Sequence, residues 1–480
     1  MDKNGACNWA VCEDCKGFGK KKRAIKSAVK KRHHTATKIT EPTATVAPKF
    51  HTENCLTCAG KGIIATQNPL VPNTNQYPHV AIIGGGIGGV ALAVACLHRG
   101  IPFTLFERDS SFDARSQGYG LTLQQASKAM AGLGILHLSE GVVSTKHVVH
   151  NPDGKIIGEW GMRKWMETNP NAKPRKNNIH NIHIARQALR MELINQLGGT
   201  SKIQWNHQLL NIKYTPNNQL NLSFMVNGEV KTTTADLVVG ADGIRSTVRK
   251  LIIDDATLPL TYLGCMVILG ICPLSKLQHI ETSLLDSATV FQTANGNDRI
   301  YVMPFTAQSV MWQLSFPITE NEALNISLKG AEALKQEAIK RTKWHSPIPQ
   351  IVEATQASQI TGYPAYDREL LQPELLQNAG PITLIGDAAH PMSPFKGQGA
   401  NQALLDALAL ARAITNNCAP NSNWQNTGIR TAVLNTFESD MITRSAVKVK
   451  ESREAAQFLH TEIVLQEGNI TRGGCAKISS

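Results

Sequence analysis

The sequence predicts an α/β protein with a parallel sheet, a β-rich inserted domain and a small cysteine-rich module at its N-terminus. Three observations predict this class. A glycine-rich turn at 84–89 stands between an apolar run and a helix-like stretch. Two more apolar runs end in glycine and aspartate, at Asp242 and Asp387. Two Cys-x-x-Cys-x-Gly-x-Gly repeats precede residue 63. Strand, turn and helix in alternation are typical of parallel sheets.

Composition excludes several classes of protein. The chain has 480 residues, of which 42% are hydrophobic and 18% charged, so it is not disordered, collagen-like or a coiled coil. Its length suggests about two to four domains. The net charge is +12, but residues 1–78 hold 13 Lys and Arg against 5 Asp and Glu. The rest is nearly balanced, which argues against a dedicated nucleic-acid enzyme.

Cysteine usage and hydropathy indicate a soluble cytoplasmic protein in a reducing compartment. Ten cysteines in 480 residues are too few for a disulfide scaffold. The first residues contain no apolar core of a secretory signal. The longest apolar run, 80–96, is interrupted by five glycines and is too short to span a membrane.

The first motif of the body is Gly84-Gly85-Gly86-Ile87-Gly88-Gly89. It follows an apolar strand at 79–83 and precedes a helix expected at 90–98. A second strand at 102–107 then ends in Glu107. Glycines at Gly84, Gly86 and Gly89 let the backbone approach a diphosphate at a helix N-terminus, and an acid after the next strand accepts hydrogen bonds from a ribose. The pattern predicts a dinucleotide site; the alternative is a glycine-rich packing turn.

The middle of the chain is β-like. Alternating segments with turn signals such as Asn227-Gly228 fill 203–235, and similar segments fill 289–316. Apolar strands are expected at 235–239 and 381–385, followed by helices at 400–414 and 432–464. The two strands place Asp242 and Asp387 where ligands sit in parallel sheets. Alternatively, Asp242 caps a helix beginning near Ile244.

Together the three motifs resemble the class A flavoprotein monooxygenases over about residues 79–465. Within that family the chain looks closest to the small single-component branch of tetracycline-inactivating, salicylate-hydroxylase-like and urate-hydroxylase-like enzymes. The resemblance implies a Rossmann-like FAD-binding fold with three layers, two of β-strands and one of helices (ββα). It also implies that FAD, NAD(P)H and O₂ hydroxylate a small aromatic or cyclic substrate through a flavin C4a-hydroperoxide. A reductase or oxidase without oxygen transfer remains the alternative.

The resemblance also assigns residues to the cofactor. It implies that Glu107 binds the adenosine ribose and that Asp387 binds the ribityl chain, while Asp242 serves FAD and NAD(P)H indirectly through the diphosphate region. Arg115 and Arg186 match arginines near the flavin, with plain surface charge as the alternative. Gly397, Gly399 and Asn401 match the loop beside the flavin pyrimidine ring. No catalytic acid or base is assigned, because the cofactor carries the difficult step; His390 is expected to be structural.

The N-terminal repeats predict a metal site. Cys12, Cys15, Cys55 and Cys58 supply four thiolates, which suit one tetrahedral Zn²⁺, and the glycines permit turns that aim N–H groups at sulfur. The repeat resembles half of the cysteine-rich domain of DnaJ-type chaperones, although 39 residues separate Cys15 from Cys55 and no J-domain is visible. A redox dithiol or unpaired knuckles are the alternatives, and Cys7 is unassigned.

A basic insert lies between the repeats. Its cations are Lys20, Lys21, Lys22, Arg23, Lys26, Lys30, Lys31 and Arg32, followed by His33 and His34. The cluster suits nucleic acid, anionic lipid or an acidic protein partner, although a solvated charged loop is favoured. A further hypothesis is that the module tethers the flavoprotein body to a partner.

These signals divide the chain into a zinc-knuckle module at 1–66, a linker at 67–78 and a monooxygenase body at 79–470. The flavin domain is expected at about 79–145, 180–255 and 375–420, the substrate sheet at about 146–179 and 256–374, and terminal helices at about 430–468. A substrate pocket is expected between flavin and sheet, where one face of 301–316 lines it. The substrate, the choice of NADH or NADPH and the oligomeric state stay open.

Overall fold

A five-stranded parallel sheet forms the centre of the body in the computed structural model, which describes residues 8–24, 50–114, 119–168, 181–215, 219–420 and 422–478. Its strands, in spatial order, are β12 (Ile203–Gln204), β6 (Phe103–Phe106), β5 (Val80–Ile83), β16 (Leu237–Gly240) and β22 (Ile382–Leu384). Because all five run in one direction, the turns that follow β5, β16 and β22 meet at one edge.

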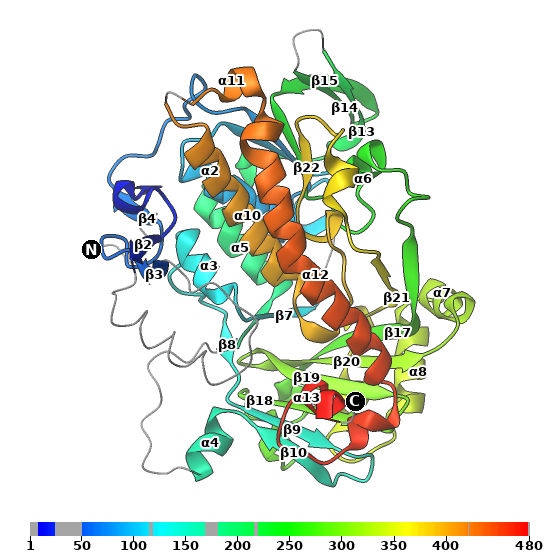
Figure 1. Ribbon diagram of the computed structural model, residues 1–480. Helices are drawn as coiled ribbons and strands as arrows, with labels where there is room; N and C mark the ends of the chain where they lie inside the picture. Colours follow the sequence, from blue (N-terminus) through cyan, green and yellow to red (C-terminus); the bar gives the residue numbers. More distant parts are fainter. Residues whose placement is uncertain are drawn as a thin grey trace, which may run out of the picture.

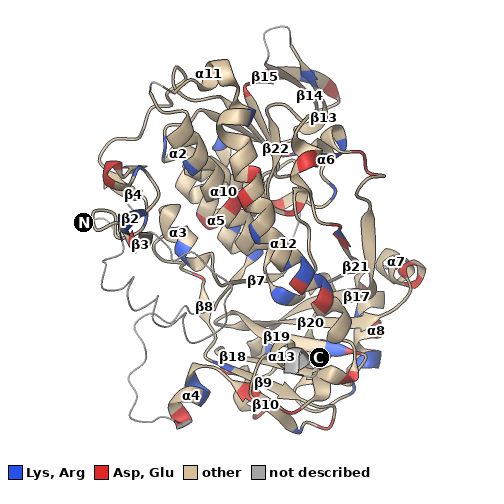
Figure 2. Ribbon diagram, viewed as in Figure 1, with Lys and Arg blue, Asp and Glu red and all other residues tan. Residues whose placement is uncertain are grey.

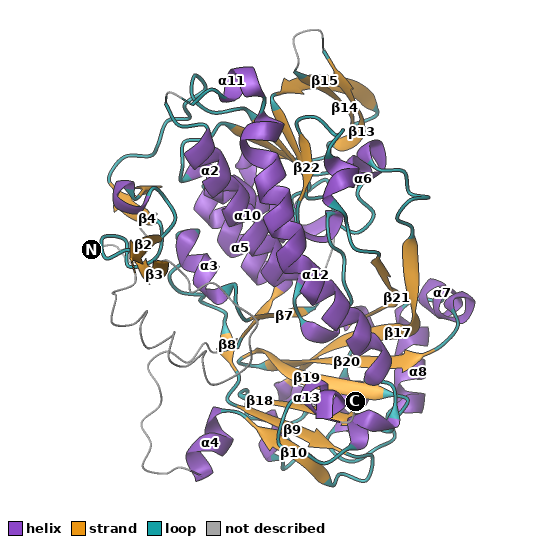
Figure 3. Cartoon of the chain, in the orientation of Figure 1, coloured by secondary structure: helices purple, strands orange, loops and turns teal. Residues whose placement is uncertain are grey.

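Helices cover one face of this sheet. They are α2 (Ile87–Leu97), α5 (Arg186–Leu197) and α10 (Gly399–Asn417), with α12 (Asn435–Phe458) packed outside α10 (Figure 1). Helix α2 is apolar on all sides because it is enclosed between its neighbours, and nine of its residues are buried. Figure 3 shows these four helices gathered together above the larger sheet.

A meander of β13 (Gln208–Tyr214), β14 (Leu220–Val226) and β15 (Glu229–Ala235) lies on the side of the parallel sheet away from α2 (Figure 1). Alternate residues of β14 are buried, and Phe224 stacks on Phe106 of the parallel sheet at 4.4 Å between ring centroids. The hairpin turn expected at Asn227-Gly228 is confirmed, since both residues have positive φ, as the turn requires.

A seven-stranded mixed sheet forms the second half of the body. Its strands, in spatial order, are β10 (Ile156–Trp160), β9 (Lys146–His150), β18 (Thr289–Ala294), β19 (Arg299–Thr306), β20 (Ser309–Pro317), β17 (Leu260–Pro273) and β21 (Ile360–Arg368). Trp312, Leu314 and Phe316 point into a core completed by α7 (Glu320–Leu328), α8 (Ala331–Arg341) and α9 (Ile348–Ala354). The opposite face carries Tyr301 and Gln313 and is left for a ligand.

Shorter elements connect the two halves. A small antiparallel sheet has the order β7 (Gly120–Leu123), β11 (Ile182–Ala185) and β8 (Val142–Val143). The remaining helices are α3 (Ser127–Gly132), α4 (Met162–Thr168), α6 (Thr247–Ile252), α11 (Trp424–Thr427) and α13 (Arg472–Ile478). Helix α6 therefore begins three residues later than the position near Ile244 expected from the sequence. No helix in the described part of the chain has the length and apolarity needed to cross a bilayer.

The N-terminal module packs against α2, α3 and α10 (Figure 1). Strand β1 (Asn8–Val11) pairs with β4 (Ile63–Thr66), and β2 (Lys20–Ala24) pairs with β3 (Phe50–Asn54). The first four basic residues lie in strand β2, so the expected loop is wrong there, although their side chains are largely exposed to solvent as expected. There Lys21 pairs with Asp14 and Arg23 with Glu53.

Some predicted features lie outside the described residues. They are Cys7, Arg115 and the rest of the basic insert, namely Lys26, Lys30, Lys31, Arg32, His33 and His34. Over the part that is described, Lys and Arg alternate with Asp and Glu along the ribbon (Figure 2).

Candidate active site and cysteine cluster

The glycine turn after β5 leaves no room for a Cβ at its first and last positions, Gly84 and Gly89. Gly84 has φ +107°, and a Cβ there would lie 2.5 Å from the carbonyl oxygen of Ala241. A Cβ on Gly89 would overlap the carbonyl oxygen of Gly84. The turns after β5 and β16 are therefore in backbone contact. Helix α2 starts from Gly86 without a side-chain cap, so its first N–H groups are available to an anion.

Glu107 is held in place by the same turn. Its buried carboxylate accepts hydrogen bonds from the N–H of Gly85 at 2.7 Å and of Asp109 at 3.0 Å. A carboxylate has about four acceptor positions, so these two bonds leave capacity for ribose hydroxyls. The sequence predicts that Glu107 binds a ribose, but it does not predict the backbone hydrogen bonds that orient the carboxylate.

Arg190 is a residue of this region that the sequence analysis missed. Its Nε donates to the carbonyl oxygen of Gly85 at 2.7 Å, and its guanidinium lies over Phe112 and Trp205, 5.1 and 5.5 Å from the ring centroids. Position 190 lies one helical turn beyond Arg186, so both arginines face the glycine turn. That i,i+4 spacing was the available signal.

Arg186 opens α5 and borders the cavity described below. Its guanidinium lies over the Tyr119 ring, 5.3 Å from the centroid, and its Nη2 lies 3.9 Å from the Cβ position of Gly86. The interpretation as a plain surface charge is therefore wrong for Arg186. Arg115, its predicted companion, lies outside the described residues.

Asp242 caps helix α6. Its Oδ2 accepts from the N–H of Thr247 at 2.7 Å and of Val248 at 3.2 Å, and Ser246 Oγ donates to Oδ1. This is the capping alternative raised from the sequence, and burial raises the pKa of Asp242. Asp242 thereby holds the turn whose Ala241 carbonyl lies against Gly84.

Arg249 joins the second and third motifs. Its buried Nη1 donates to the carbonyl oxygens of Ala388 and Ala389 at 2.9 and 3.1 Å. Burial, with a smaller contribution from Arg368, lowers the pKa of Arg249 to about 10, so it remains a cation at neutral pH. One arginine thus fixes the spacing between the turns after β16 and β22.

Asp387 follows β22, and its side chain is exposed to the cavity. Its Oδ1 lies 3.4 Å from the Cβ position of Gly399, at the N-terminus of α10. Burial raises the pKa of Asp387, and the nearby charges of His390 and Arg186 oppose that rise. A carboxylate in this position can accept hydrogen bonds from a polyol.

Asp406 is the second residue that the sequence analysis missed. It is fully buried on α10, where its Oδ2 accepts from the N–H of Gly386 at 2.9 Å and from His390 Nε2 at 2.7 Å. Its Oδ1 accepts from Arg444 of α12 at 2.6 Å. Burial would raise the pKa of Asp406, but His390 and Arg444 lower it on balance. His390 is accordingly a positioning group, as expected.

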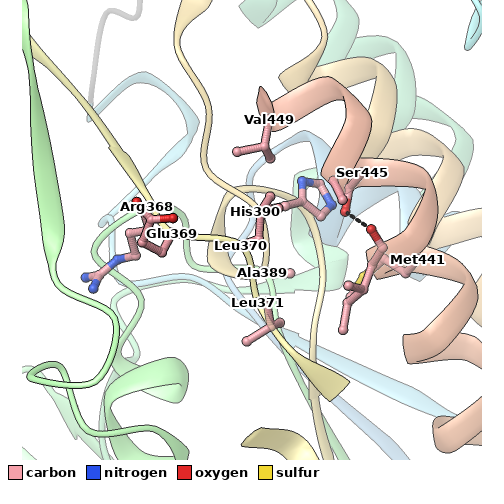
Figure 4. A pocket seen from close by; sticks show the side chains of 11 residues that line it. Arg368, Glu369, Leu370, Leu371, Ala389, His390, Met441, Ser445 and Val449 are labelled. Carbon is pink, nitrogen blue, oxygen red and sulfur yellow. Dashed lines mark hydrogen bonds between the residues drawn. The ribbon is translucent and has the colours of Figure 1, made fainter. Parts of the chain in front are cut away.

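Figure 4 shows His390 pointing toward α12 beside Ser445, with Ala389 behind it. The small cavity at this place has a volume of about 10 Å³ and is bordered by Met441 and Val449. Such a volume suffices for at most about one water molecule. It cannot be the substrate site.

Asn401 ties two loops together from the first turn of α10. Its Oδ1 accepts from the N–H groups of Gln124 and Ala126 at 2.9 and 3.2 Å, and its Nδ2 donates to Thr122 and Gly397, each at 2.8 Å. Gly397 has φ +60°, which suits glycine. Asn401 is thus committed to the backbone, and the loop N–H groups near Gly397 and Gly399 border the cavity.

One cavity of about 910 Å³ connects these groups with the seven-stranded sheet. Its wall at one end includes Gly86, Arg186 and Asp387, and at the other end Tyr301 and Gln313. Met303 and Met311 line it too, whereas Ser315 Oγ donates a hydrogen bond within the protein to His460 Nε2, since Nδ1 of that ring donates to Ala456. The volume suits a large ligand with a smaller one beside it. The uncapped helix, the glycine turn and the acids Glu107 and Asp387 fit FAD.

The sheet end of the cavity is polar and basic. Arg299 is buried, its Nε donates to Gln292 at 2.8 Å, and no carboxylate in the described part of the chain forms an ion pair with it. Burial lowers the pKa of Arg299 to about 10. His147 stacks on Trp160 with the ring planes 4° apart. His183, hydrogen-bonded to Thr122 at 3.0 Å, has no partner for Nε2 in the described structure.

The four predicted metal ligands come together in the module. Their sulfur atoms all lie within 4.8 Å of one another, with Cys12 to Cys55 at 3.9 Å and Cys15 to Cys58 at 3.7 Å. A tetrahedral Zn²⁺ with Zn–S bonds of ~2.3 Å requires S···S separations of ~3.8 Å. All four side chains are buried, and none forms a disulfide. The cluster could therefore hold a metal.

Backbone N–H groups are aimed at two of these sulfurs, as the glycines predict. Gly19 donates to Cys15 at 3.2 Å and Gly62 to Cys58 at 3.1 Å. Gly17, Gly19, Gly60 and Gly62 all have positive φ, so the two knuckles turn in the same way. Such bonds favour thiolate over thiol at the two sulfurs.

Gly89→Ala should weaken FAD binding at least about tenfold, equivalent to ~1.4 kcal/mol, because its Cβ would displace the carbonyl of Gly84. Gly88→Ala is the matched control, since its Cβ would meet only ordinary contact, 3.4 Å from Ala403. Fluorescence titration of the flavin-free proteins with FAD measures both. Equal affinities in the two variants would contradict the proposed diphosphate turn.

His183 makes stability depend on pH. Burial, with a smaller contribution from His147, lowers the pKa of His183 from 6.5 to about 3, so below pH 6.5 the unfolded state binds a proton that the folded state refuses. Stability is complete above pH 6.5 and falls as the pH drops toward 4. His183→Asn should reduce that slope by up to ~1.4 kcal/mol per pH unit, whereas exposed His137→Asn should not. Urea denaturation at several pH values decides the matter; an unchanged slope in His183→Asn would refute the assignment.

Comparisons with known proteins agree with this geometry. The chain is 28% identical over 342 residues to the aurachin C monooxygenase/isomerase of Stigmatella aurantiaca, covering 70% of this chain and 80% of that protein. It is 25% identical over 389 residues to the 3-amino-4-hydroxybenzoate 2-monooxygenase of Streptomyces cremeus, covering 79% and 87%. A variant of Klebsiella pneumoniae HpxO complexed with FAD has the same fold, with a TM-score of 0.64 and 18% identity over 84% of this chain and 94% of that one.

A family model described as an FAD binding domain matches residues 77–419. The match includes all three glycine and aspartate motifs and both halves of the body. The chain therefore belongs to the FAD binding domain family and is a class A FAD-dependent monooxygenase, an oxidoreductase.

Proposed function

We propose that the enzyme uses NAD(P)H and O₂ to hydroxylate a small aromatic substrate that carries an acidic group. The observation that carries this proposal is the single cavity of about 910 Å³, which runs from the glycine turn to a sheet face bearing an unpaired arginine. Bound FAD supplies the redox chemistry: it takes up hydride, reacts with O₂ and delivers one oxygen atom. The chain supplies orientation, charge and exclusion of water.

At the cofactor end, the first N–H groups of α2 would receive the diphosphate, with Arg186 beside them. Glu107 would accept hydrogen bonds from the adenosine ribose, and Asp387 from the ribityl chain. The turn at Gly397 and Gly399, held by Asn401, would border the pyrimidine ring. The positive end of α10 would stabilise negative charge on the reduced ring by ~1–2 kcal/mol. Asp406 would keep that helix end and the Asp387 turn in register.

Along the cavity as a whole, the cations outnumber the acids. Residues that line the cavity include Arg186, Arg245, Arg299, Lys396, Lys448 and Arg472, against Asp387 and Glu451. Lys448 pairs with Glu451, and Arg472 donates to backbone carbonyls. Arg299 is the cation held on the rigid sheet, between Gln292 and Tyr301. A buried cation without a carboxylate favours an anionic ligand. One relative is named for a hydroxybenzoate, which is an aromatic acid.

We also propose that Cys12, Cys15, Cys55 and Cys58 hold a structural Zn²⁺. The supporting observations are two S···S distances near the ~3.8 Å of a zinc tetrathiolate, the closeness of all four sulfurs, and the two N–H···S bonds. The cluster lies in the module rather than in the wall of the large cavity, so it has no direct part in oxygen transfer. A redox dithiol would instead require two of these sulfur atoms to approach each other and form a disulfide bond.

The reaction is tested with the FAD-loaded enzyme, a panel of hydroxylated and aminated benzoates, and NADH or NADPH. A substrate should accelerate oxidation of the nicotinamide and acquire one atom from isotopically labelled O₂, detected by mass spectrometry. Reduction of the flavin without O₂ should stop after one turnover. Continued turnover without O₂ would instead establish a reductase, and quantitative release of peroxide with every substrate would establish an oxidase.

Arg299→Met should raise KM for an acidic substrate about 10–100-fold, the loss expected for one charged hydrogen bond, and change kcat much less. The amide of the same substrate should lose far less affinity. Arg163→Met is the control. It removes a partly exposed arginine of helix α4 that is paired with Asp286, and it should leave KM unchanged. Steady-state kinetics measure all three. An equal rise in KM for acid and amide would contradict recognition of the charge.

A further inference from the structure

Two arginines of the flavin-binding body lie where the module docks. Arg412 of α10 donates from Nε to the carbonyl oxygen of Gly17, two residues from Cys15, at 2.9 Å. Arg99 follows α2, is 3% exposed, and donates from Nη1 to Ala95 at 2.9 Å. Arg99 directly follows His98, whose ring lies 6.3 Å from that of Trp9 in the module.

Neither arginine has a conventional counter-ion. Among the described residues, no carboxylate forms an ion pair with Arg99 or Arg412, and Nε and Nη2 of Arg99 have no hydrogen-bond partner. The acid nearest to the sulfurs, Asp14, is paired with Lys21 and accepts from Thr57 and Cys55. An isolated buried cation such as Arg99 is costly, and with the partly buried Arg412 beside the same module it calls for a compensating negative charge.

The cluster itself can supply that charge. Four thiolates around one divalent zinc ion carry a net charge of −2, whereas four thiols or two disulfides carry none. Two arginines match this value. The position of Arg99 at the end of α2 accounts for one carbonyl contact, but it leaves the other two nitrogens of its guanidinium without partners.

The module is docked tightly enough for such an interaction. Trp9 is 6% exposed, with its ring 6.3 Å from that of His98 and its Nε1 2.5 Å from the Cβ position of Gly134. The carbonyl oxygen of Lys61 lies 3.3 Å from the Cβ position of Gly132, so that a side chain there would push the second knuckle away. Both knuckles therefore rest on the body.

We propose that the cysteine cluster binds zinc as a tetrathiolate of net charge −2, and that Arg99 and Arg412 are its counter-ions, so that zinc fastens the module to α2 and α10. These two helices begin at the flavin site, at Ile87 and Gly399, and the module holds their opposite ends. The inference rests on the proposed zinc ligation and is independent of the oxygenation chemistry.

Zinc affinity of the full-length, FAD-loaded chain tests the proposal, by competition with a chromogenic chelator. Arg412→Gln and Arg99→Gln should each weaken zinc binding about 10–100-fold, as is typical for loss of a group that supports metal ligands. Arg412→Lys keeps the charge and should stay within about threefold of the wild type. Lys128→Gln, which removes an exposed cation from neighbouring α3, is the matched control. Retained flavin absorbance shows that each variant is folded.

A second measurement uses the wild type alone. Chymotrypsin should cut the segment 67–78, which contains Leu70 and Tyr77, faster once the zinc is removed, because the module then leaves α2 and α10. A wild-type chain that binds no zinc would overturn the proposal. So would Gln variants whose zinc affinity is unchanged, or a cleavage rate that does not respond to zinc.

Discussion

Backbone contact between the turns after β5 and β16 is the constraint on which the site depends. At Gly84 and Gly89 the chain passes so close to itself and to Ala241 that no Cβ can be accommodated. This contact brings the open end of α2 against the Asp242 turn, and Arg249 extends the arrangement to the turn after β22. Three segments separated by more than a hundred residues thus form one edge that is able to receive a dinucleotide.

Buried charge organises the rest of the molecule. Asp406 satisfies the backbone of Gly386, the ring of His390 and the guanidinium of Arg444, and so links β22, α10 and α12. Such groups are stabilising when every partner is present and costly when one is missing. Arg299 in the cavity, and Arg99 and Arg412 at the module, form no ion pair with a carboxylate of the described residues, and these are the two places where we propose an anionic ligand.

Several site residues could be predicted because their roles are local. The glycines of 84–89 and the acid Glu107 follow strands whose lengths and directions are evident from the apolar pattern. The four cysteines were predicted as one site because each pair sits in the same short motif. Asp242 was harder, since a residue after a strand and before a helix can bind a ligand or cap the helix. The structure shows the cap.

What the sequence by itself determined is the order of strands, glycine turns and acids, together with the cysteine repeats, because these depend on residues close together along the chain. Only the tertiary structure decided which side chains from distant parts of the chain come into contact. Arg190 joins Gly85, Asp406 joins Arg444, and Arg412 reaches the cysteine module nearly 400 residues away. Pairings of this kind arise when helices pack and buried charges must find partners. No periodicity in the sequence encodes them.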